Sequence, residues 1–224
     1  MFARVVFRFM ATIFEDFLES ADAAVGLLES DEVAARWGEP SACAGFSVGG
    51  LAAHLGWQVQ SARWAVESQR PAAGAAVTGL AEHYERAQWL GRDTQEPVNL
   101  GIRDTGEQRA QAGAVEQARL TRQAREALAA EFGPLGPTEV VAVPWIEGRA
   151  MTLDDLLATR VLELLIHTDD LAVSVGVDTP RSSDGAYLRV IGILSGISVR
   201  RFGPVAVLRA LSRAERSPET ISAF

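Results

Sequence analysis

Residues 160–176, RVLELLIHTDDLAVSVG, are the most informative segment for the fold of this chain. From Val161 to His167 every residue is aliphatic except Glu163 and His167 themselves, so the segment predicts a helix buried around most of its circumference. These two polar residues are four positions apart and share one face of the helix, roughly 5–6 Å from each other. Because a buried carboxylate without a partner is costly, a second group is expected to compensate Glu163.

A divalent cation is one group that would compensate this carboxylate. Glu163 and His167 offer an oxygen and an imidazole nitrogen on one side of a helix, as metal sites in bundle cores require. Asp170 continues the same face and could orient a histidine ligand, which makes it a candidate catalytic residue. The alternative is an ion pair between Glu163 and Arg160, three residues earlier, with His167 as a buried core histidine. Spacing alone leaves both interpretations open.

A third ligand is expected from a facing helix, and His54 is the best candidate among the three histidines of the chain. It lies in GGLAAHLGWQ, within a helix that Ser47 is suited to cap, and Gly49 and Gly50 would permit a close helix approach. Two histidines and one carboxylate leave coordination positions open, which is the pattern of catalytic metal sites. His54 lies to one side of the apolar stripe of its helix, so the assignment requires a helix covered on both sides.

Helical periodicity dominates the rest of the chain, and the expected fold class is all-α. One run, TEVVAV at 138–143, is strand-like and is expected to be an extended connection or half of a hairpin. Helices are expected at about 5–36, 47–69, 78–89 (capped by Thr78), 104–132, 152–176, 184–202 and 204–216. This pattern predicts a four-helix bundle over residues 1–180 with additional short helices, and a helical C-terminal tail over residues 181–224 that packs on it.

Composition limits the classes of function. The net charge of −8 argues against a nucleic-acid binder, and no charge-free stretch is apolar enough for a membrane span. The single cysteine, Cys43, excludes an intramolecular disulfide and favours the cytoplasm. All 21 basic residues are arginine, which excludes any mechanism based on lysine.

The C-terminal tail differs in charge from the rest of the chain. Residues 181–224 carry seven arginines against three acids, a net charge of +4. Arg213 is a candidate catalytic residue that would fix an acidic substrate, and Arg209 and Arg216 are candidates for cofactor binding. The simpler interpretation is that the three arginines form one solvated face of an amphipathic helix.

Other chemically distinctive residues have structural interpretations. His83 stands among charged residues and is interpreted as a surface histidine, although it could be a fourth ligand or proton carrier. Cys43 lies near a helix start, where its pKa could fall, but a packing role is preferred. The tryptophans at helical spacing are expected in the core, with a pocket lining as the alternative: Trp57, Trp64, Trp89 and Trp145.

Four segments resemble a known family. They are CAGFSV at 43–48, LAAHL at 51–55, ELLIHTDDL at 163–171 and AVLRALSRAER at 206–216. The chain resembles the mycothiol-dependent maleylpyruvate isomerase family, through its metal-binding N-terminal domain, which is part of the DinB-like superfamily. The resemblance implies a DinB-like four-helix bundle and a divalent metal, typically zinc, held by His54, Glu163 and His167. It also implies the thiol cofactor mycothiol, whose sulfur would meet the metal.

The expected activity follows from this resemblance. It is a metal- and thiol-dependent isomerisation or S-transfer on a small electrophilic substrate. The isomerase of the family carries a separate C-terminal α/β domain with a substrate-binding arginine, whereas residues 181–224 read as helices, so maleylpyruvate isomerisation itself is not expected here. The alternatives are a metal-dependent hydrolase that uses bound water, and a non-catalytic metal-binding or regulatory module, with a homodimer formed through the apolar N-terminal helix.

Overall fold

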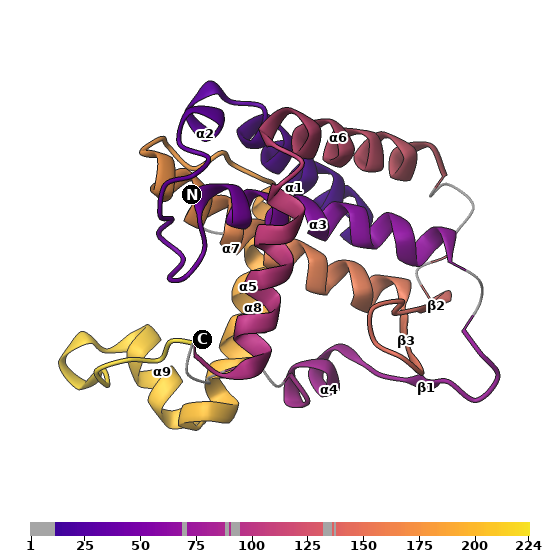
Figure 1. Ribbon diagram of the computed structural model, residues 1–224. Helices are drawn as coiled ribbons and strands as arrows, with labels where there is room; N and C mark the ends of the chain where they lie inside the picture. The colour runs from indigo at the N-terminus through magenta and orange to yellow at the C-terminus, as the bar shows by residue number, and fades with distance from the viewer. Residues whose placement is uncertain (1–11, 69–70, 88–89, 91–94, 132–135, 137) are drawn as a thin grey trace.

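The computed structural model describes residues 12–68, 71–87, 90, 95–131, 136 and 138–224 (Figure 1). These residues form an all-α protein with one small sheet, which confirms the expected fold class. The helices are α1 (Ile13–Leu28), α2 (Asp31–Ala35), α3 (Val48–Glu67), α4 (Leu80–Glu85), α5 (Pro97–Ala110), α6 (Ala114–Glu131), α7 (Leu153–Val175), α8 (Asp184–Phe202) and α9 (Pro204–Ser212), followed by a 3-10 turn at Ala214–Arg216. The strands are β1 (Ala76–Val77), β2 (Val140–Ala142) and β3 (Arg149–Thr152).

Four of these helices form the bundle. Helix α7 packs on α1 and α3, and α6 also packs on α3 and α1, so the four helices close around one core. Each contributes a fully buried large side chain: Phe17 from α1, Leu55 from α3, Leu128 from α6 and Leu157 from α7. Burying one such side chain stabilises the fold by about 1.5–3 kcal/mol. Helix α5 crosses α3 on the outside of this core (Figure 1).

The two helices that carry the candidate ligands are defined by local signals that the sequence predicted correctly. The Ser47 hydroxyl accepts a hydrogen bond from the Gly50 backbone N–H at 2.9 Å and caps α3. The Thr152 hydroxyl accepts from the Asp155 N–H at 3.2 Å and caps α7. Gly176 ends α7 with a left-handed φ of 73°, a conformation that glycine adopts without strain.

Two expected long helices are each divided in the structure. The helix expected at 104–132 is two helices, α5 and α6, and Gly113 between them has a φ of +85°. The helix expected at about 5–36 is divided into α1 and α2 near Ser30, whose hydroxyl caps α2, and its part before residue 12 lies outside the described residues. Both predictions were wrong because helical periodicity continues across a break, while the break itself depends on one residue.

The short elements also differ from expectation. Thr78 does not cap α4, because Gly79 is the N-cap and the Thr78 N–H donates to the carbonyl of Ala150 beside the sheet. Of the segment that follows, residues 88–89 lie outside the described residues. Helix α9 ends at Ser212, earlier than expected. The strand-like run is half of a hairpin, since β2 pairs antiparallel with β3, and β1 pairs parallel with β3 on its other edge.

The C-terminal helices lie against one side of the bundle. Helix α8 packs on α7 and α1, and α9 packs on α8. No helix of the described residues is long and apolar enough to cross a membrane. The division into a bundle at 1–180 and an extension at 181–224 stays a prediction.

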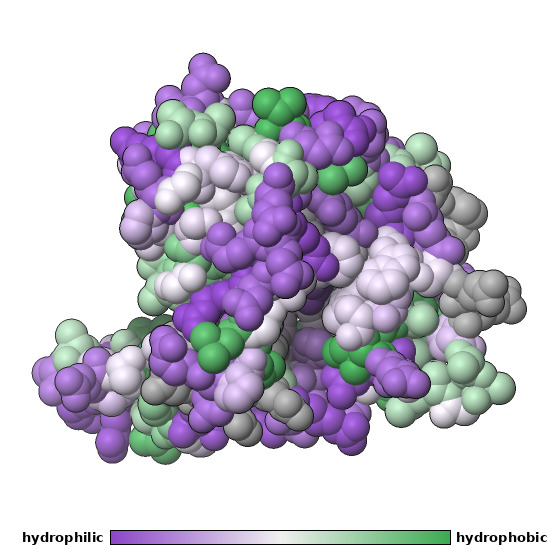
Figure 2. Space-filling model, in the orientation of Figure 1, coloured by the Kyte–Doolittle hydropathy of each residue, from purple (hydrophilic) through white to green (hydrophobic). Residues whose placement is uncertain are grey.

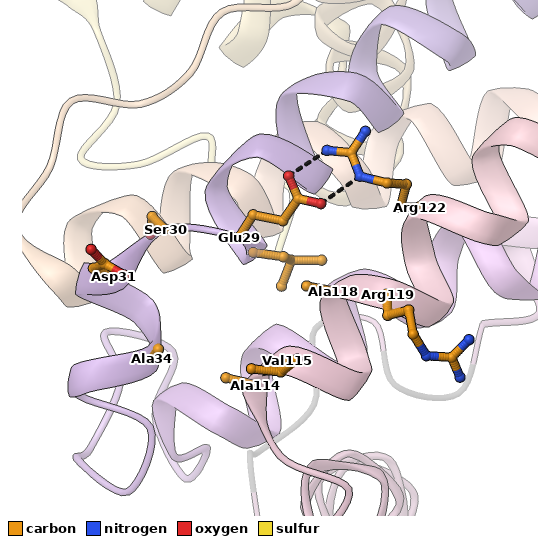
Figure 3. Close-up of a pocket in the computed structure, with 10 residues that line it drawn as sticks. Glu29, Ser30, Asp31, Ala34, Ala114, Val115, Ala118, Arg119 and Arg122 are labelled. Atoms are coloured by element: carbon orange, nitrogen blue, oxygen red, sulfur yellow. Dashed lines mark hydrogen bonds and ion pairs between the residues drawn. The ribbon is translucent and has the colours of Figure 1, made fainter.

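The surface has two hollowed regions relevant to the search for a site. Figure 2 shows a recess beside α5, above α4, on the face where α3 and α7 lie behind α5. A separate pocket of about 360 Å³ lies between the α1–α2 turn and the start of α6, where Arg122 forms an ion pair with Glu29 (Figure 3). None of the candidate ligands lines this second pocket.

Close packing of α5 on α3 gives a first prediction. A Cβ at Gly106 of α5 would meet the carbonyl oxygen of Gly50 at 2.9 Å and the ring of Phe46 at 2.8 Å. Gly106→Ala is therefore expected to lower the free energy of unfolding by about 1–3 kcal/mol, as overpacking does. Gly101→Ala in the same helix meets nothing within 4 Å and is expected to raise it by up to about 1 kcal/mol. Urea denaturation of both variants tests this, and equal effects would contradict it.

Candidate metal centre

Helices α3 and α7 bring the three predicted ligands together. His54 comes from α3, and Glu163 and His167 come from successive turns of α7. The Glu163 Oε2 atom lies 3.3 Å from His167 Nε2 and 3.9 Å from His54 Nε2. One potential ligand atom from each residue lies within 4.8 Å of the other two. The side chains are 15–16% exposed, so the cluster is partly buried and reachable from solvent.

The position of His54 is explained by the burial of α3 on more than one side. This helix packs on α5 and α6 as well as on α7, so residues outside its apolar stripe are also covered. The His54 ring lies edge-on to the His167 ring, with 4.9 Å between centroids, and 5.6 Å from the centroid of Phe46. The condition that the sequence left open, a helix covered on both sides, is met.

Arg160 does not form the ion pair with Glu163 that was the alternative interpretation of this helix. Its Nη1 atom donates to Gln58 Oε1, and its Nε atom donates to the Thr159 hydroxyl at 3.1 Å. Within the described residues, the ion pairs of Glu163 are those with the two histidines. The two histidines, and not Arg160, are therefore the direct partners of the buried carboxylate.

The charge states of Glu163 and His54 suit a bound cation. Burial raises the pKa of Glu163, but hydrogen bonds from His167 and His54 outweigh it and hold that pKa well below its usual range. Burial is also the main reason why the pKa of His54 is lowered, so this ring is neutral at pH 7. An ionised carboxylate and a neutral imidazole are the forms in which these residues bind metals.

Asp170 holds the third ligand in a defined orientation. Its Oδ2 atom accepts a hydrogen bond from His167 Nδ1 at 2.9 Å, which directs Nε2 toward Glu163. Burial lowers the pKa of His167, but hydrogen bonds to Asp170 and Glu163 outweigh it and raise the pKa to about 9. Such a carboxylate–histidine pair is common behind metal ligands, where it fixes the ring and raises its basicity. The neighbouring Asp169 accepts from the Thr179 hydroxyl instead.

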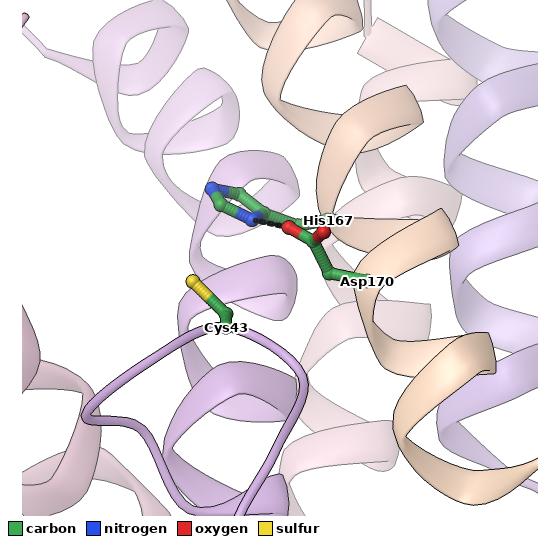
Figure 4. Close-up of side chains that lie close together, drawn as sticks. All are labelled: Cys43, His167 and Asp170. Atoms are coloured by element: carbon green, nitrogen blue, oxygen red, sulfur yellow. Dashed lines mark hydrogen bonds and ion pairs between the residues drawn. The ribbon is translucent and has the colours of Figure 1, made fainter. Parts of the chain in front are cut away.

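The Cys43 side chain lies close to those of Asp170 and His167 (Figure 4). Its sulfur and one ligand atom of each of these residues lie within 4.8 Å of one another. Burial, and secondarily the charge of Asp170, raises the pKa of the thiol to about 11. The idea that the nearby helix start lowers this pKa is therefore wrong, and the thiol is neutral at pH 7.

Two further polar residues lie near the cluster: Gln58, which was not recognised from the sequence, and His83, for which a role as a fourth ligand or proton carrier was the less favoured interpretation. Gln58 is buried and its amide nitrogen donates to the His54 carbonyl oxygen at 2.9 Å and lies 3.2 Å from His54 Nε2. His83, interpreted above as a surface histidine, is half-buried, and its buried Nδ1 atom has no hydrogen-bond partner among the described residues. Gln58 is one helical turn from His54, which was the available signal. His83 gave none, since its neighbours in sequence are charged.

The C-terminal arginines lie elsewhere. Arg209, Arg213 and Arg216 are exposed on α9 and the turn that follows it. Arg213 Nη1 donates to the carbonyl of Ser212, and Arg216 pairs with Glu215 at 3.4 Å. No interaction among the described residues joins these arginines to the cluster, and their roles in substrate and cofactor binding stay predictions.

The tryptophans form a cluster of their own. The rings of Trp57, Trp64 and Trp145 lie with centroids 5.9–6.4 Å apart, and Trp64 is 43% exposed. Trp89 lies outside the described residues. These three rings form a partly exposed aromatic surface and not a closed core.

The protonation of His167 predicts how metal affinity depends on pH. Because the ring must lose its proton to bind, affinity is expected to rise about tenfold per pH unit from pH 7 to about pH 9, and then to level off. Competition titration of zinc against a chromophoric chelator at several pH values measures this. A flat profile from pH 7 to pH 9 would contradict it.

Asp170 provides a companion test. Asp170→Asn is expected to weaken zinc binding by about 10–100-fold, the usual effect of losing a carboxylate behind a histidine ligand. It should also move the plateau of the pH profile to lower pH, because the hydrogen bond that raises the pKa of His167 is lost. Asp169→Asn, one residue away, is the control and should change neither property.

The fold and cluster define a class: a helical-bundle protein with two histidines and a carboxylate converging at one partly buried point. The model of the mycothiol maleylpyruvate isomerase N-terminal domain matches residues 17–172, and the chain belongs to this family. The matched residues include all three candidate ligands, the whole of α3 and all but the last residues of α7. Neither a curated protein nor a solved structure gives a significant match to the chain.

Proposed function

We propose that this protein is a divalent-metal enzyme that uses mycothiol and acts on a small electrophilic substrate, either as an isomerase or as an S-transferase. The observation that supports it most is the convergence of His54, Glu163 and His167 from two helices onto one point, with no competing ion pair to Arg160. Membership of the mycothiol maleylpyruvate isomerase N-terminal domain family supports the thiol. Zinc is the metal that the donor set suits best.

The residues of the chain have separate roles in this proposal. His54, Glu163 and His167 hold the metal, and Asp170 keeps the His167 ring in the binding orientation. A divalent metal with an open position supplies a deprotonated thiol, a nucleophile for an electrophilic carbon. The raised pKa of the Cys43 thiol keeps it neutral, so in this proposal the reacting sulfur belongs to mycothiol and not to Cys43.

A hydrolase has less support in the same geometry. It needs a general base beside the metal, and Asp170 is a carboxylate next to the ligand His167 that could fill that role. The Asp170 Oδ2 atom already accepts a hydrogen bond from His167 Nδ1, so this carboxylate orients the metal ligand His167. The hydrolase and the non-catalytic module remain as outcomes of the experiment.

Cobalt spectroscopy tests the proposal directly. Cobalt-loaded protein titrated with mycothiol is expected to develop a sulfur-to-metal charge-transfer band, whereas S-methyl mycothiol should give none. Cys43→Ser is the matched control, and it should show the same band because the sulfur comes from the added thiol. Absence of the band in both proteins would refute the thiol-dependent function. Substrate hydrolysis without thiol would then favour the hydrolase.

A further inference from the structure

The side-chain amide of Gln58 lies beside the candidate ligand His54, and Arg160 fixes which way the amide points. Gln58 is 1% exposed, and its Oε1 atom accepts a hydrogen bond from Arg160 Nη1. A guanidinium has donors and no acceptor, so the amide oxygen must face Arg160 and the amide nitrogen must face His54. The opposite orientation of the amide would set two donors against each other. A hydrogen-bond donor therefore faces the candidate metal centre from α3.

Both hydrogens of this amide nitrogen are directed to His54. One goes to the His54 carbonyl oxygen at 2.9 Å, and the other goes to His54 Nε2 at 3.2 Å. His54 Nε2 is closer to the Gln58 nitrogen than to Glu163 Oε2, which lies 3.9 Å away. The ring nitrogen therefore accepts the hydrogen bond with its lone pair, and the neutral ring carries its proton on Nδ1. Gln58 thus holds His54 in the tautomer whose Nε2 atom can bind a cation.

A cation bound to His54 would leave one hydrogen of the amide without an acceptor. The cation takes the lone pair of Nε2, which is the acceptor of this hydrogen in the structure. The amide cannot turn to another acceptor, because Arg160 holds its oxygen and the His54 carbonyl holds its other hydrogen. Within the described residues, the hydrogen bonds of Gln58 Nε2 are these two to His54. Since a buried donor without an acceptor is costly, a ligand of the metal is expected to supply one.

We propose that Gln58 Nε2 donates a hydrogen bond to the atom that fills the open position of the metal centre, and thereby selects an anionic atom, such as a thiolate sulfur, over a neutral one. The cation and the amide adjoin the same nitrogen of His54, so the amide borders the ligands of the cation. Hydrogen bonds to charged acceptors are about twice as strong as those to neutral acceptors. The inference deepens the proposed function and rests on it for the metal and its open position.

Titration of the cobalt-loaded protein with 2-mercaptoethanol tests this role of Gln58. The probe is expected to give a sulfur-to-metal charge-transfer band in the wild type. Gln58→Met keeps the size of the side chain and removes the donor, so it should bind the probe roughly tenfold or more weakly. Its band should lie at longer wavelength, because a hydrogen bond to the sulfur lowers the energy of the electrons that are transferred. A merely structural role of Gln58 would not move the band.

A second variant and a matched control accompany this measurement. Gln58→Glu keeps an oxygen for Arg160 but replaces the donor by a second oxygen, so it should bind the probe more weakly still. Gln60→Met removes an amide of the same helix that donates to the Thr121 hydroxyl of α6, and it should match the wild type in affinity and band position. Cobalt content is measured in every variant.

The outcomes separate this inference from the proposed function. If the wild type gives the band and both Gln58 variants match it in affinity and wavelength, the role of Gln58 is refuted and the proposed function stands. Loss of cobalt from both variants also refutes it, because the amide then serves only the ligand His54. If the wild type binds no cobalt, both proposals fail.

Azide decides the inference if the thiol-dependent function fails. If the cobalt-loaded wild type gives no band with 2-mercaptoethanol or mycothiol, azide is titrated instead. Azide binding weakened by roughly tenfold in Gln58→Met supports the donor, and equal binding refutes it. If Gln58→Met does not fold, Gln58→Glu decides alone by the same criteria.

Discussion

Glu163→Gln is expected to abolish stoichiometric metal binding. Glutamine keeps the shape of the side chain but replaces the one charged oxygen donor of the cluster, which lies 3.3 Å and 3.9 Å from the two imidazoles. The affinity for zinc should fall by roughly a hundredfold or more, since breaking a buried charge interaction costs about 3–5 kcal/mol. Elemental analysis after gel filtration should give one zinc per wild-type chain and none in the variant.

The design of this experiment must separate loss of a ligand from loss of the fold. Asp169→Asn removes an acid six residues away on the same helix and should keep its zinc, because Asp169 bonds Thr179 and not a histidine. Circular dichroism and thermal melting in the presence of chelator report whether Glu163→Gln is folded. A folded Glu163→Gln protein with a full equivalent of zinc would place the metal elsewhere.

The candidate ligands on α7 could be predicted from the sequence because the signals that identify them are all local to their own helix. Glu163 and His167 are the polar residues of an otherwise aliphatic run, and burial of a carboxylate demands a partner. The ends of that helix, Thr152 and Gly176, are local capping signals that need no tertiary context. The sequence could not decide whether Arg160 or a cation compensates Glu163. The answer depends on Gln58 of α3, whose side-chain oxygen accepts a hydrogen bond from the Arg160 guanidinium.

Other features depended on packing and were predicted poorly. Helical periodicity continues across Gly113, and the break between α5 and α6 occurs at this single glycine, whose φ is +85°. His83 appeared to be a surface residue because its sequence neighbours are charged, but α4 packs on α7 and half-buries it. The charge at the C-terminus drew attention to Arg209, Arg213 and Arg216, whereas the arginine that acts electrostatically on His54 and Glu163 is Arg160. Charge counts identify exposed residues more readily than buried ones, which are few.

Asp16→Ala is expected to be the most destabilising of the substitutions away from the cluster. Asp16 of α1 is 0% exposed and accepts hydrogen bonds from the Ser183 hydroxyl at 2.6 Å and from Nε and Nη2 of Arg189 at 3.2 Å and 3.1 Å. Gly185 allows this approach, since a Cβ there would lie 2.8 Å from the Asp16 carboxylate. Removing the carboxylate leaves the Arg189 guanidinium and the hydroxyl proton of Ser183 without this acceptor and should lower the free energy of unfolding by about 3 kcal/mol.

The same helix offers a matched comparison. Asp22 also pairs with an arginine of another helix, Arg125 of α6, but its side chain is 55% exposed. Asp22→Ala should therefore change the free energy of unfolding by less than about 1 kcal/mol, as exposed ion pairs do. Urea denaturation with chelator present compares the two variants without the contribution of the metal. A cost for Asp16→Ala no greater than that for Asp22→Ala would mean that apolar packing alone attaches α8 to the bundle. A larger cost, reduced in a cycle with Arg189→Ala, would mean that the buried charge fixes α8 against α1.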